Sequence, residues 1–391
     1  MLIIESRNAE GSSSPGCTCV PHPGSSGRAR RHLGTCSHDI QCRKNNGFQE
    51  QINKQNKISL CAIKQLIPPP IQMTSQKINE GLLSFIYEQT GRRVIYEQEP
   101  TPLLGGMNST TYKFKLRGMD PMVLRLLGSE RNAEDVKRIR IHSQALICAN
   151  IRAPKVHWVC EKKSALGGVF TIMEFFPDPL LAKQPLDIQH KILGASHAEL
   201  HNHSTASVIN ELKSSGLNEN QFMASLFMPL LLDSAQSNHP WLSNTISWLQ
   251  NNLPVASGNA SINHGDYHPK NIMYNSDQIT GIIDWNLSIG DPAFDIGKII
   301  TFIMDIAPNV AGGFTREMAI ENYWYYRNSY QSIRSINMGA VNACRVSRCT
   351  TLLLHCLSGK KDVFTTSPGM LKNLKTTIES ITNLEIELPC P

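Results

Sequence analysis

Long apolar runs are missing from this sequence. The longest, from Phe222 to Leu232, contains Pro229, is too short to cross a bilayer, and predicts a buried helix. The N-terminal residues Met1 to Ile4 are followed at once by Glu5, so the apolar core of a secretory signal is missing as well. No internal repeat is present. These absences argue against a membrane-spanning, exported or repeat protein, and we expect a cytoplasmic chain with no membrane partner.

A basic surface suited to nucleic acid is also missing from most of the chain. The formal net charge is +6, but residues 1–70 hold nine Lys and Arg against four Asp and Glu. The remaining residues are therefore almost neutral. This balance argues against a nucleic-acid groove on the folded part.

Regular hydrophobic patterning is missing from residues 1–75, which are rich in Gly, Ser, Pro and polar side chains. We expect a disordered tail and linker here, with a helical pattern starting near Gln76. Five of the 11 cysteines lie in the first 61 residues, with spacings that match no familiar zinc module. A metal site in the tail stays open as an alternative, while the dispersed cysteines elsewhere favour a reducing compartment.

The stretch from His264 to Asn271, His-Gly-Asp-Tyr-His-Pro-Lys-Asn, is the most informative in the chain. Asp266 and Asn271 lie five positions apart on one expected loop, and Asp284 ends the β-type run that follows. Three oxygen-bearing side chains can thus converge on one point. Phosphoryl transfer needs such a point, because a base meets the incoming hydroxyl while hard oxygen ligands hold Mg²⁺ on the phosphates of ATP.

Together with Ile283-Asp284-Trp285 and Gly290-Asp291-Pro292-Ala293-Phe294-Asp295-Ile296, this stretch resembles the signature blocks of the aminoglycoside phosphotransferase and choline kinase superfamily. Members are small-molecule kinases with the protein-kinase fold. The resemblance implies an α+β, two-lobed, protein-kinase-like chain. Residues 76–176 would form a nucleotide-binding lobe with a small antiparallel sheet, and residues 177–391 a helical catalytic and substrate-binding lobe.

The resemblance also implies a role for each matching residue. Asp266 would be the catalytic base that accepts or orients the hydroxyl proton. Asn271 and Asp284 would ligate Mg²⁺. His264 and Asp295 would brace the catalytic loop through hydrogen bonds.

Residues upstream of these blocks predict a phosphate-binding hairpin. A glycine and hydroxyl turn, Leu104 to Thr111, leads into the alternating strand Tyr112 to Leu116, and Met122 to Leu126 follows as the paired strand. In the related kinases a lysine on this second strand pairs with the phosphates, and here Arg125 stands in its place. The strand around Glu174 would enter the hinge that binds adenine. The expected nucleotide-binding residues are Gly105, Gly106, Asn108, Ser109, Thr110, Arg125 and Glu174.

The usual partner of the phosphate-pairing residue, a glutamate on the next helix, has no clear match. Glu130 and Glu134 lie at the start of the expected helix, and His142 stands nearest to the usual position. Macrodipole stabilisation of the helix start explains the two glutamates equally well. The partner of Arg125 therefore stays open.

Two further groups were weighed as candidate ligand contacts. His197 and His201 lie on a helical pattern and are expected to be core or hydrogen-bonded groups rather than metal ligands. The aromatic residues Tyr323 to Tyr326, with Tyr330, have helical spacing, and some of them could line a pocket for a cationic or ring-bearing substrate.

The function that these features predict is ATP-dependent transfer of a phosphoryl group to a hydroxyl of a small molecule such as an aminoglycoside, an amino alcohol or a sugar. The first alternative is a nucleotide-binding pseudokinase that acts by interaction. The second is a hydrolase whose metal is held by His264, Asp266 and His268. Neither the acceptor nor the oligomeric state can be predicted.

Overall fold

A computed structural model describes residues 74–103, 109–128, 130–162, 166–254, 260–358 and 364–389. The expected tail, apart from its last two residues, lies outside these ranges. So do Gly105, Gly106 and Asn108 of the expected phosphate-binding turn.

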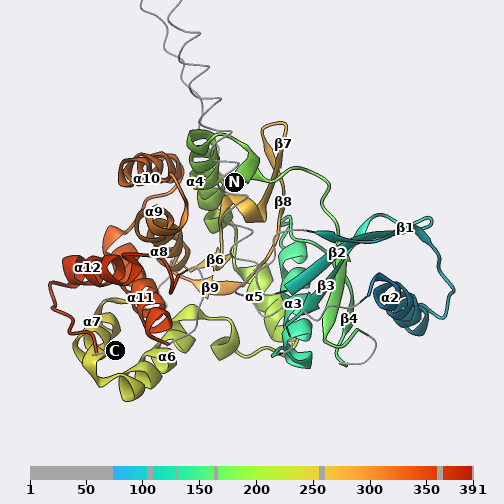
Figure 1. Cartoon of the computed structure of the whole chain (residues 1–391), viewed down its shortest axis with the longest axis horizontal. Helices are drawn as coiled ribbons and strands as arrows, with labels where there is room; N and C mark the ends of the chain where they lie inside the picture. The colour runs from blue at the N-terminus through green and yellow to red at the C-terminus, as the bar shows by residue number, and fades with distance from the viewer. Residues whose placement is uncertain are drawn as a thin grey trace, which may run out of the picture. The chain divides into compact units, whose positions relative to one another are not determined.

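A five-stranded antiparallel sheet occupies the N-terminal part of the described chain (Figure 1). Its strands run in the order β1-β2-β3-β5-β4. Their bounds are β1 Tyr96–Leu103, β2 Ser109–Leu116, β3 Met122–Leu127, β4 Val156–Cys160 and β5 Phe170–Glu174. The predicted hairpin is present as β2 and β3, and its turn contains Gly118 in the left-handed region (φ 75°), which favours glycine.

Period-two alternation sets the two faces of β3. Met122, Leu124 and Leu126 are buried in the core of the sheet, whereas Arg125 lies on the opposite face and is half-buried. This alternation directs the one cation of the strand away from the apolar core.

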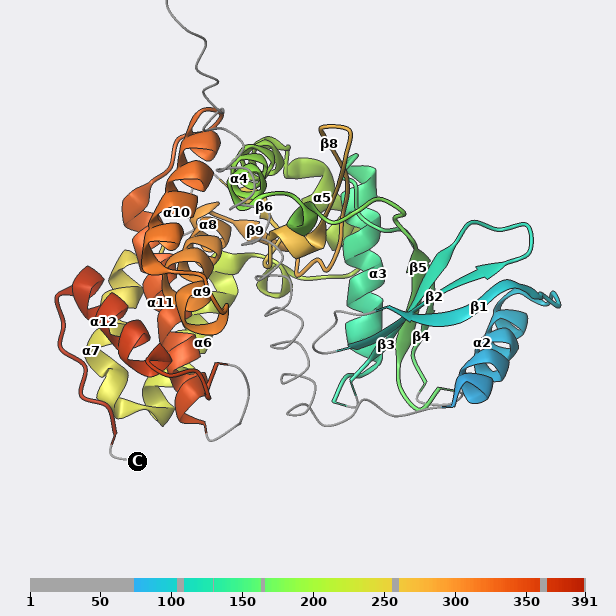
Figure 2. The same ribbon diagram turned by 45° about the horizontal axis from the view of Figure 1, so that its top comes forward.

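Helices α2 (Ser75–Thr90) and α3 (Ala133–Cys148) pack with this sheet. The apolar face of α2 joins the sheet core through Leu82, Phe85 and Ile86. Helix α3 begins at a capping box formed by Asn132 and Asp135. Figure 2 shows α3 between the sheet and the mainly helical part of the chain.

The rest of the chain is mainly helical. Its helices are α4 Leu186–Asn202, α5 Ala206–Ser214, α6 Ala224–Asn238, α7 Ser243–Asn252, α8 Ala293–Thr301, α9 Ala307–Val310, α10 Arg316–Gln331, α11 Met338–Leu357 and α12 Met370–Thr382. A π-helical segment, Phe302–Ile306, continues α8. Two short strand pairs lie among the helices, β6 (Ser261–Asn263) with β9 (Ser288–Gly290) and β7 (Ile272–Asn275) with β8 (Gln278–Ile282).

A small antiparallel sheet followed by a mainly helical part confirms the predicted α+β fold class. The two strand pairs position candidate functional residues, because Asp266 lies on the loop after β6 and Asp284 on the loop after β8. Within the described ranges, no helix is both long and apolar enough to span a membrane.

Candidate active site

The loop after β6 depends on a glycine. Gly265 has φ 84°, a conformation that side-chain-bearing residues rarely adopt, and a Cβ atom there would lie 2.5 Å from the backbone oxygen of Asn286. The loop can therefore approach the segment after Asp284 closely only with glycine at this position.

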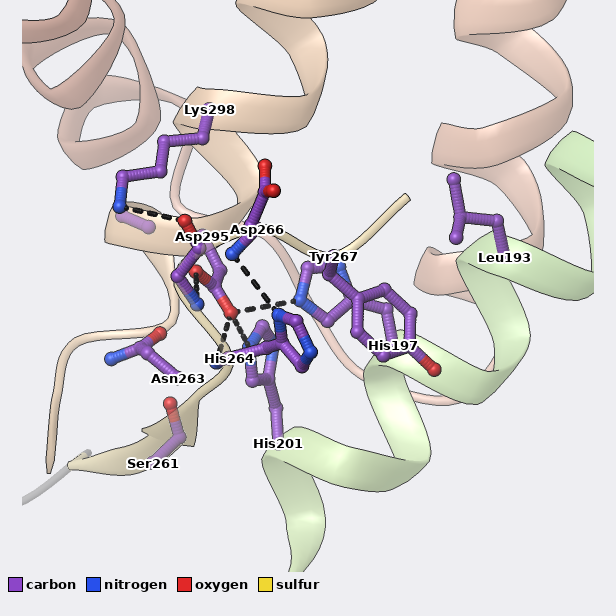
Figure 3. Close-up of polar contacts among 12 residues, drawn as sticks. Leu193, His197, His201, Ser261, Asn263, His264, Asp266, Tyr267, Asp295 and Lys298 are labelled. Carbon is purple, nitrogen blue, oxygen red and sulfur yellow. Dashed lines mark hydrogen bonds and ion pairs between the residues drawn. The ribbon is translucent and has the colours of Figure 1, made fainter. Parts of the chain in front are cut away.

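Asp295, on the first turn of α8, holds the backbone of this loop. Its carboxylate accepts hydrogen bonds from the backbone N–H of His264 (2.5 Å) and of Gly265 (2.8 Å). It also accepts from His197 Nε2 at 3.3 Å (Figure 3). Burial tends to raise the pKa of Asp295, but hydrogen bonds from His197 and His201 lower it well below its usual value. The carboxylate is therefore charged and fully engaged with the loop.

His264 ties the loop to both sides of Asp284. Its Nε2 donates to the backbone oxygen of Ile283 at 2.9 Å, and its Nδ1 accepts from the backbone N–H of Asp266 at 3.1 Å. Its own backbone oxygen accepts from Asn286 N at 2.9 Å. These partners require the neutral Nε2–H tautomer. Burial favours the neutral form as well, since it lowers the pKa of His264 to about 4.

The Asp266 carboxylate points away from this network, as Figure 3 shows. Its Oδ2 lies 3.4 Å from His268 Nε2 and accepts from Asn271 Nδ2 at 3.4 Å, and 63% of its side chain is exposed. Desolvation raises the pKa of Asp266, but His268, His264 and Lys298 together lower it below the usual value. Asp266 is therefore an ionised carboxylate that is open to a ligand.

Asn271 lies beside Asp266, and its hydrogen bonds determine which of its side-chain atoms is Nδ2 and which is Oδ1. Its Nδ2 donates to the backbone oxygen of Asp266 at 3.0 Å, and a carbonyl can only accept. Its Oδ1 is thus on the other side and accepts no hydrogen bond within the described residues. The backbone oxygen of Asn271 accepts from Ile283 N at 2.9 Å, so this end of the loop is also bonded to the Asp284 segment.

Asp284 is in the left-handed region at φ 63°, which is uncommon for a residue other than glycine. Its Oδ1 lies 2.6 Å from Arg125 Nη2, so the sheet and the loop are joined by an ion pair. Arg125 Nε also donates to Ser109 Oγ at 3.2 Å. Asp284 Oδ2 and Asn271 Oδ1 are hard oxygen donors, which is the donor type that suits Mg²⁺.

Two further residues expected to contact the nucleotide, Thr110 and Glu174, lie on strands of the sheet. Thr110 lies on β2 next to Ser109. Glu174 ends β5, where its Oε2 accepts from Lys155 N at 3.2 Å and its own N–H donates to the backbone oxygen of Lys155 at 2.9 Å. The side chain and the backbone N–H of Glu174 are therefore already engaged.

None of the residues weighed as the helix partner of Arg125 contacts it. Glu130 is paired with Arg131, and Glu134 with Lys137. His142 is buried, and burial lowers its pKa to about 4. In the described part of the chain, the acidic partner of Arg125 is Asp284 instead.

His197, His201 and Asp295 form a buried group whose nearest ligand atoms all lie within 4.8 Å of one another. Each ring has at least one partner other than a metal, and His201 Nε2 makes no hydrogen bond within the described residues. His197 Nδ1 and His201 Nδ1 each lie 2.8 Å from a tyrosine hydroxyl of α10, those of Tyr326 and Tyr330. Both tyrosines are fully buried. The two histidines are hydrogen-bonded core groups, as the sequence suggested.

The metal-hydrolase interpretation of His264, Asp266 and His268 does not fit this geometry. Both ring nitrogens of His264 are bonded to backbone atoms. The group that could hold a metal among the described residues is instead the buried one around Asp295.

Lys298 was not identified from the sequence. Its Nζ donates to the backbone oxygen of Gly265 at 3.0 Å, one residue before the candidate base. It follows Asp295 by three positions on α8, so the helical repeat places both on neighbouring turns toward the same loop. That spacing is the signal that could have found it.

Comparison with known proteins agrees with this geometry. The model of the phosphotransferase enzyme family matches residues 99–326, which is more than half of the chain. The chain therefore belongs to the phosphotransferase enzyme family, and the predicted class of enzyme, a phosphotransferase, is confirmed. No curated protein matches the sequence.

The solved structures that resemble the chain share its fold at low sequence identity. One is assigned as an aminoglycoside phosphotransferase from Ralstonia eutropha JMP134. It is 17% identical with a TM-score of 0.53, covering 78% of this chain and 98% of that one. A thermostable mutant of the aminoglycoside phosphotransferase APH(4)-Ia with AMP-PNP and hygromycin B is 14% identical with a TM-score of 0.49, covering 77% and 98%. Macrolide 2′-phosphotransferase type I is 12% identical with a TM-score of 0.48, covering 78% and 98%. The first likeness shows the predicted kinase-like fold.

Proposed function

We propose that this chain transfers the γ-phosphoryl group of ATP to a hydroxyl group of a small molecule. The observation that carries the proposal is the bonding between three loop segments. Direct hydrogen bonds connect the segments of Asp266, Asn271 and Asp284, so their oxygen atoms are presented together. Family membership supports phosphoryl transfer as the chemistry.

Asp266 is the proposed base. Its ionised, exposed carboxylate can accept or orient the proton of an acceptor hydroxyl. In the proposed reaction, a bond forms between the hydroxyl oxygen and the γ-phosphorus. The bond from that phosphorus to the β–γ bridging oxygen breaks, the proton passes to Asp266, and ADP leaves.

Asn271 and Asp284 are the proposed magnesium ligands. A magnesium ion held by these two residues would supply positive charge that stabilises the negative charge developing on the phosphate groups. The chain contributes the amide oxygen of Asn271 and the carboxylate of Asp284, both held by backbone bonds on either side. Arg125 is the proposed phosphate contact on β3, and Ser109 positions its guanidinium.

His264 and Asp295 are proposed to hold this arrangement rather than to touch substrate. His264 is fully buried and Asp295 nearly so, and both bond to the backbone of the loop. The expected adenine contacts at Glu174, and the turn with Gly105, Gly106, Asn108 and Thr110, remain part of the proposal.

A pseudokinase is the second candidate, because no glutamate within the described ranges pairs with Arg125. The presence of Asp266, Asn271 and Asp284 favours the active enzyme. The deciding experiment is magnesium-dependent ADP release when pools of hydroxyl compounds are offered to the purified full chain. An active enzyme should release ADP faster with at least one pool than with none. Nucleotide binding without acceptor-dependent release from any pool would favour the pseudokinase.

A further inference from the structure

Two cations from two different helices lie near Asp266. Lys298 of α8 donates to the backbone oxygen of Gly265, and its charge acts on the Asp266 carboxylate. Arg348 of α11 also acts electrostatically on Asp266. Helices α8 and α11 pack closely here, since a Cβ atom on Gly297 would lie 2.7 Å from Cys344 Cβ. Arg348 follows Cys344 by one helical turn, and Lys298 follows Gly297 directly.

Arg348 differs from its neighbour Arg345 in the partners that the described ranges offer it. Arg345 Nη2 pairs with the buried carboxylate of Asp305 at 2.8 Å. Arg348 is half-buried, yet within the described residues it makes no hydrogen bond or ion pair. Burial lowers the pKa of Arg348, while the charge of Asp266 acts in the opposite direction. A partly desolvated guanidinium without a partner is unfavourable by itself, and an incoming anion would offset that cost.

An exposed aromatic side chain, Phe302, lies next to His268 of the loop. Phe302 is 43% exposed, and its ring is stacked against that of His268 at 6.5 Å between centroids. His268 in turn lies beside the Asp266 carboxylate. Phe302 begins the π-helical segment, and such segments are frequent at functional sites. The surroundings of Asp266 thus include two cations and, through His268, the ring of Phe302.

We propose that Arg348 selects an acceptor that carries an anionic group, a carboxylate or a phosphate, in addition to the hydroxyl that is phosphorylated. This inference rests on the proposed function. Arg348 binds the anionic group as a fork of donors, and Lys298 adds a second positive charge near Asp266. A cationic acceptor would meet repulsion from both side chains, so the proposed site disfavours aminoglycosides and amino alcohols.

The first test compares four three-carbon alcohols at equal concentration: glycerate, glycerol 3-phosphate, glycerol and 2-amino-1,3-propanediol. ADP release is measured with the full chain, Mg²⁺ and ATP. We expect one of the two anions to be the best acceptor. Comparing the rates with glycerate and with glycerol 3-phosphate then shows whether the site prefers a carboxylate or a phosphate. A preference for the neutral or the cationic compound would overturn the inference.

The second test changes the charge at position 348. Arg348→Gln should raise the KM for the anionic acceptor on the order of 10- to 100-fold, because a charge-assisted bond is lost, and leave the KM for ATP unchanged. Arg348→Lys should recover part of the loss. Arg140→Gln removes the same charge from an exposed site on α3 and should change neither constant. If Arg348→Gln instead lowers kcat or raises the KM for ATP, then Arg348 contacts the transferred phosphoryl group rather than the acceptor, and the inference is wrong.

A third measurement separates the two proposals if none of the four alcohols is phosphorylated. Inorganic phosphate is titrated into the chain saturated with Mg²⁺ and AMP-PNP, and binding is followed by calorimetry. Tighter binding to the wild type than to Arg348→Gln supports the anion site even if the proposed function fails. Equal binding to the two proteins, with equal melting temperatures, overturns the site.

Discussion

Arg125 Nη2 lies 2.6 Å from Asp284 Oδ1, so the residue proposed to hold phosphate is paired with a residue proposed to hold magnesium. The pair joins β3 of the sheet to the loop after β8. Neither partner is deeply buried, since the side chains are 24% and 44% exposed, and exchange with a ligand is therefore feasible. Magnesium would compete with Arg125 for Asp284 Oδ1, and the phosphates of the nucleotide would compete with Asp284 for Arg125. The other oxygen of Asp284 is unengaged within the described residues.

The first prediction concerns the two metal ligands. Asp284→Ala should weaken Mg·ATP binding more than Asn271→Ala, because a carboxylate offers a full charge and an amide only a dipole. Titration calorimetry with Mg·AMP-PNP would measure both. Asp277→Ala is the control, since Asp277 also has a left-handed backbone (φ 60°) but lies in the β7–β8 turn. Unchanged nucleotide affinity in both test variants would remove the metal assignment.

The second prediction concerns the base. Asp266→Asn keeps the shape of the side chain but loses the charge, so turnover should fall by a factor on the order of 10² to 10⁴. Nucleotide affinity should stay nearly intact. Asp120→Asn, on the exposed β2–β3 turn, controls for the substitution itself. A folded Asp266→Asn protein with nearly normal turnover would exclude Asp266 from the mechanism.

Local patterns in the sequence predicted the hairpin and the order of the site segments. Alternation in Met122 to Leu126 was enough to predict β3, because one face of that strand is buried. The spacing predicted that Asp266 and Asn271 share one loop and that Asp284 ends the β-type run after it; Asp266 follows β6, Asn271 precedes β7 and Asp284 follows β8. These are short-range features, which a single chain displays directly.

The contacts that the sequence could not show come from elements distant in the chain. Arg125 meets Asp284 only after the sheet packs against the helical part, and no local pattern indicates that pairing. Arg348 and Asp266, which influence each other electrostatically, come from α11 and the loop after β6, and α11 packs on α8 at Gly297. The acid that pairs with Arg125 lies on the loop after β8, whereas Glu134 of α3 pairs with Lys137.

The third prediction concerns Gly265. Gly265→Ala adds a Cβ atom both to a left-handed backbone and against Asn286 O, so it should cost roughly 1–3 kcal/mol of stability and most of the turnover. Gly118→Ala is a matched control, because its φ is 75° but nothing lies within 4 Å of the added atom. Urea unfolding of both variants separates backbone strain from the clash. Equal losses in the two proteins would mean that contact with Asn286 is unimportant.

The fourth prediction concerns the N-terminal segment. Residues 1–70 show no pattern that would build a core, so deleting them should leave the melting temperature and the catalytic rate within error of those of the full chain. Hydrogen exchange of the full chain with and without chelator is the companion measurement. Chelator-sensitive protection between Cys17 and Cys42 would reveal a folded metal module instead.

The last prediction concerns pH. Burial lowers the pKa of His142 to about 4, against an ordinary value near 6.5 in the unfolded chain. Between these values the unfolded state binds the proton and the folded state does not, so stability falls as the pH falls through this window. His264, whose pKa is also about 4, and His201, at about 3, act in the same direction.

The His142 contribution alone should be roughly 2 kcal/mol between pH 7.5 and pH 5. Free energies of unfolding in urea at the two pH values would measure it. His142→Leu should lose less stability on acidification than the wild type, whereas His203→Leu, at an exposed position, should behave like the wild type. An unchanged pH dependence in His142→Leu would show that His142 can accept a proton in the folded chain, and that its surroundings admit water.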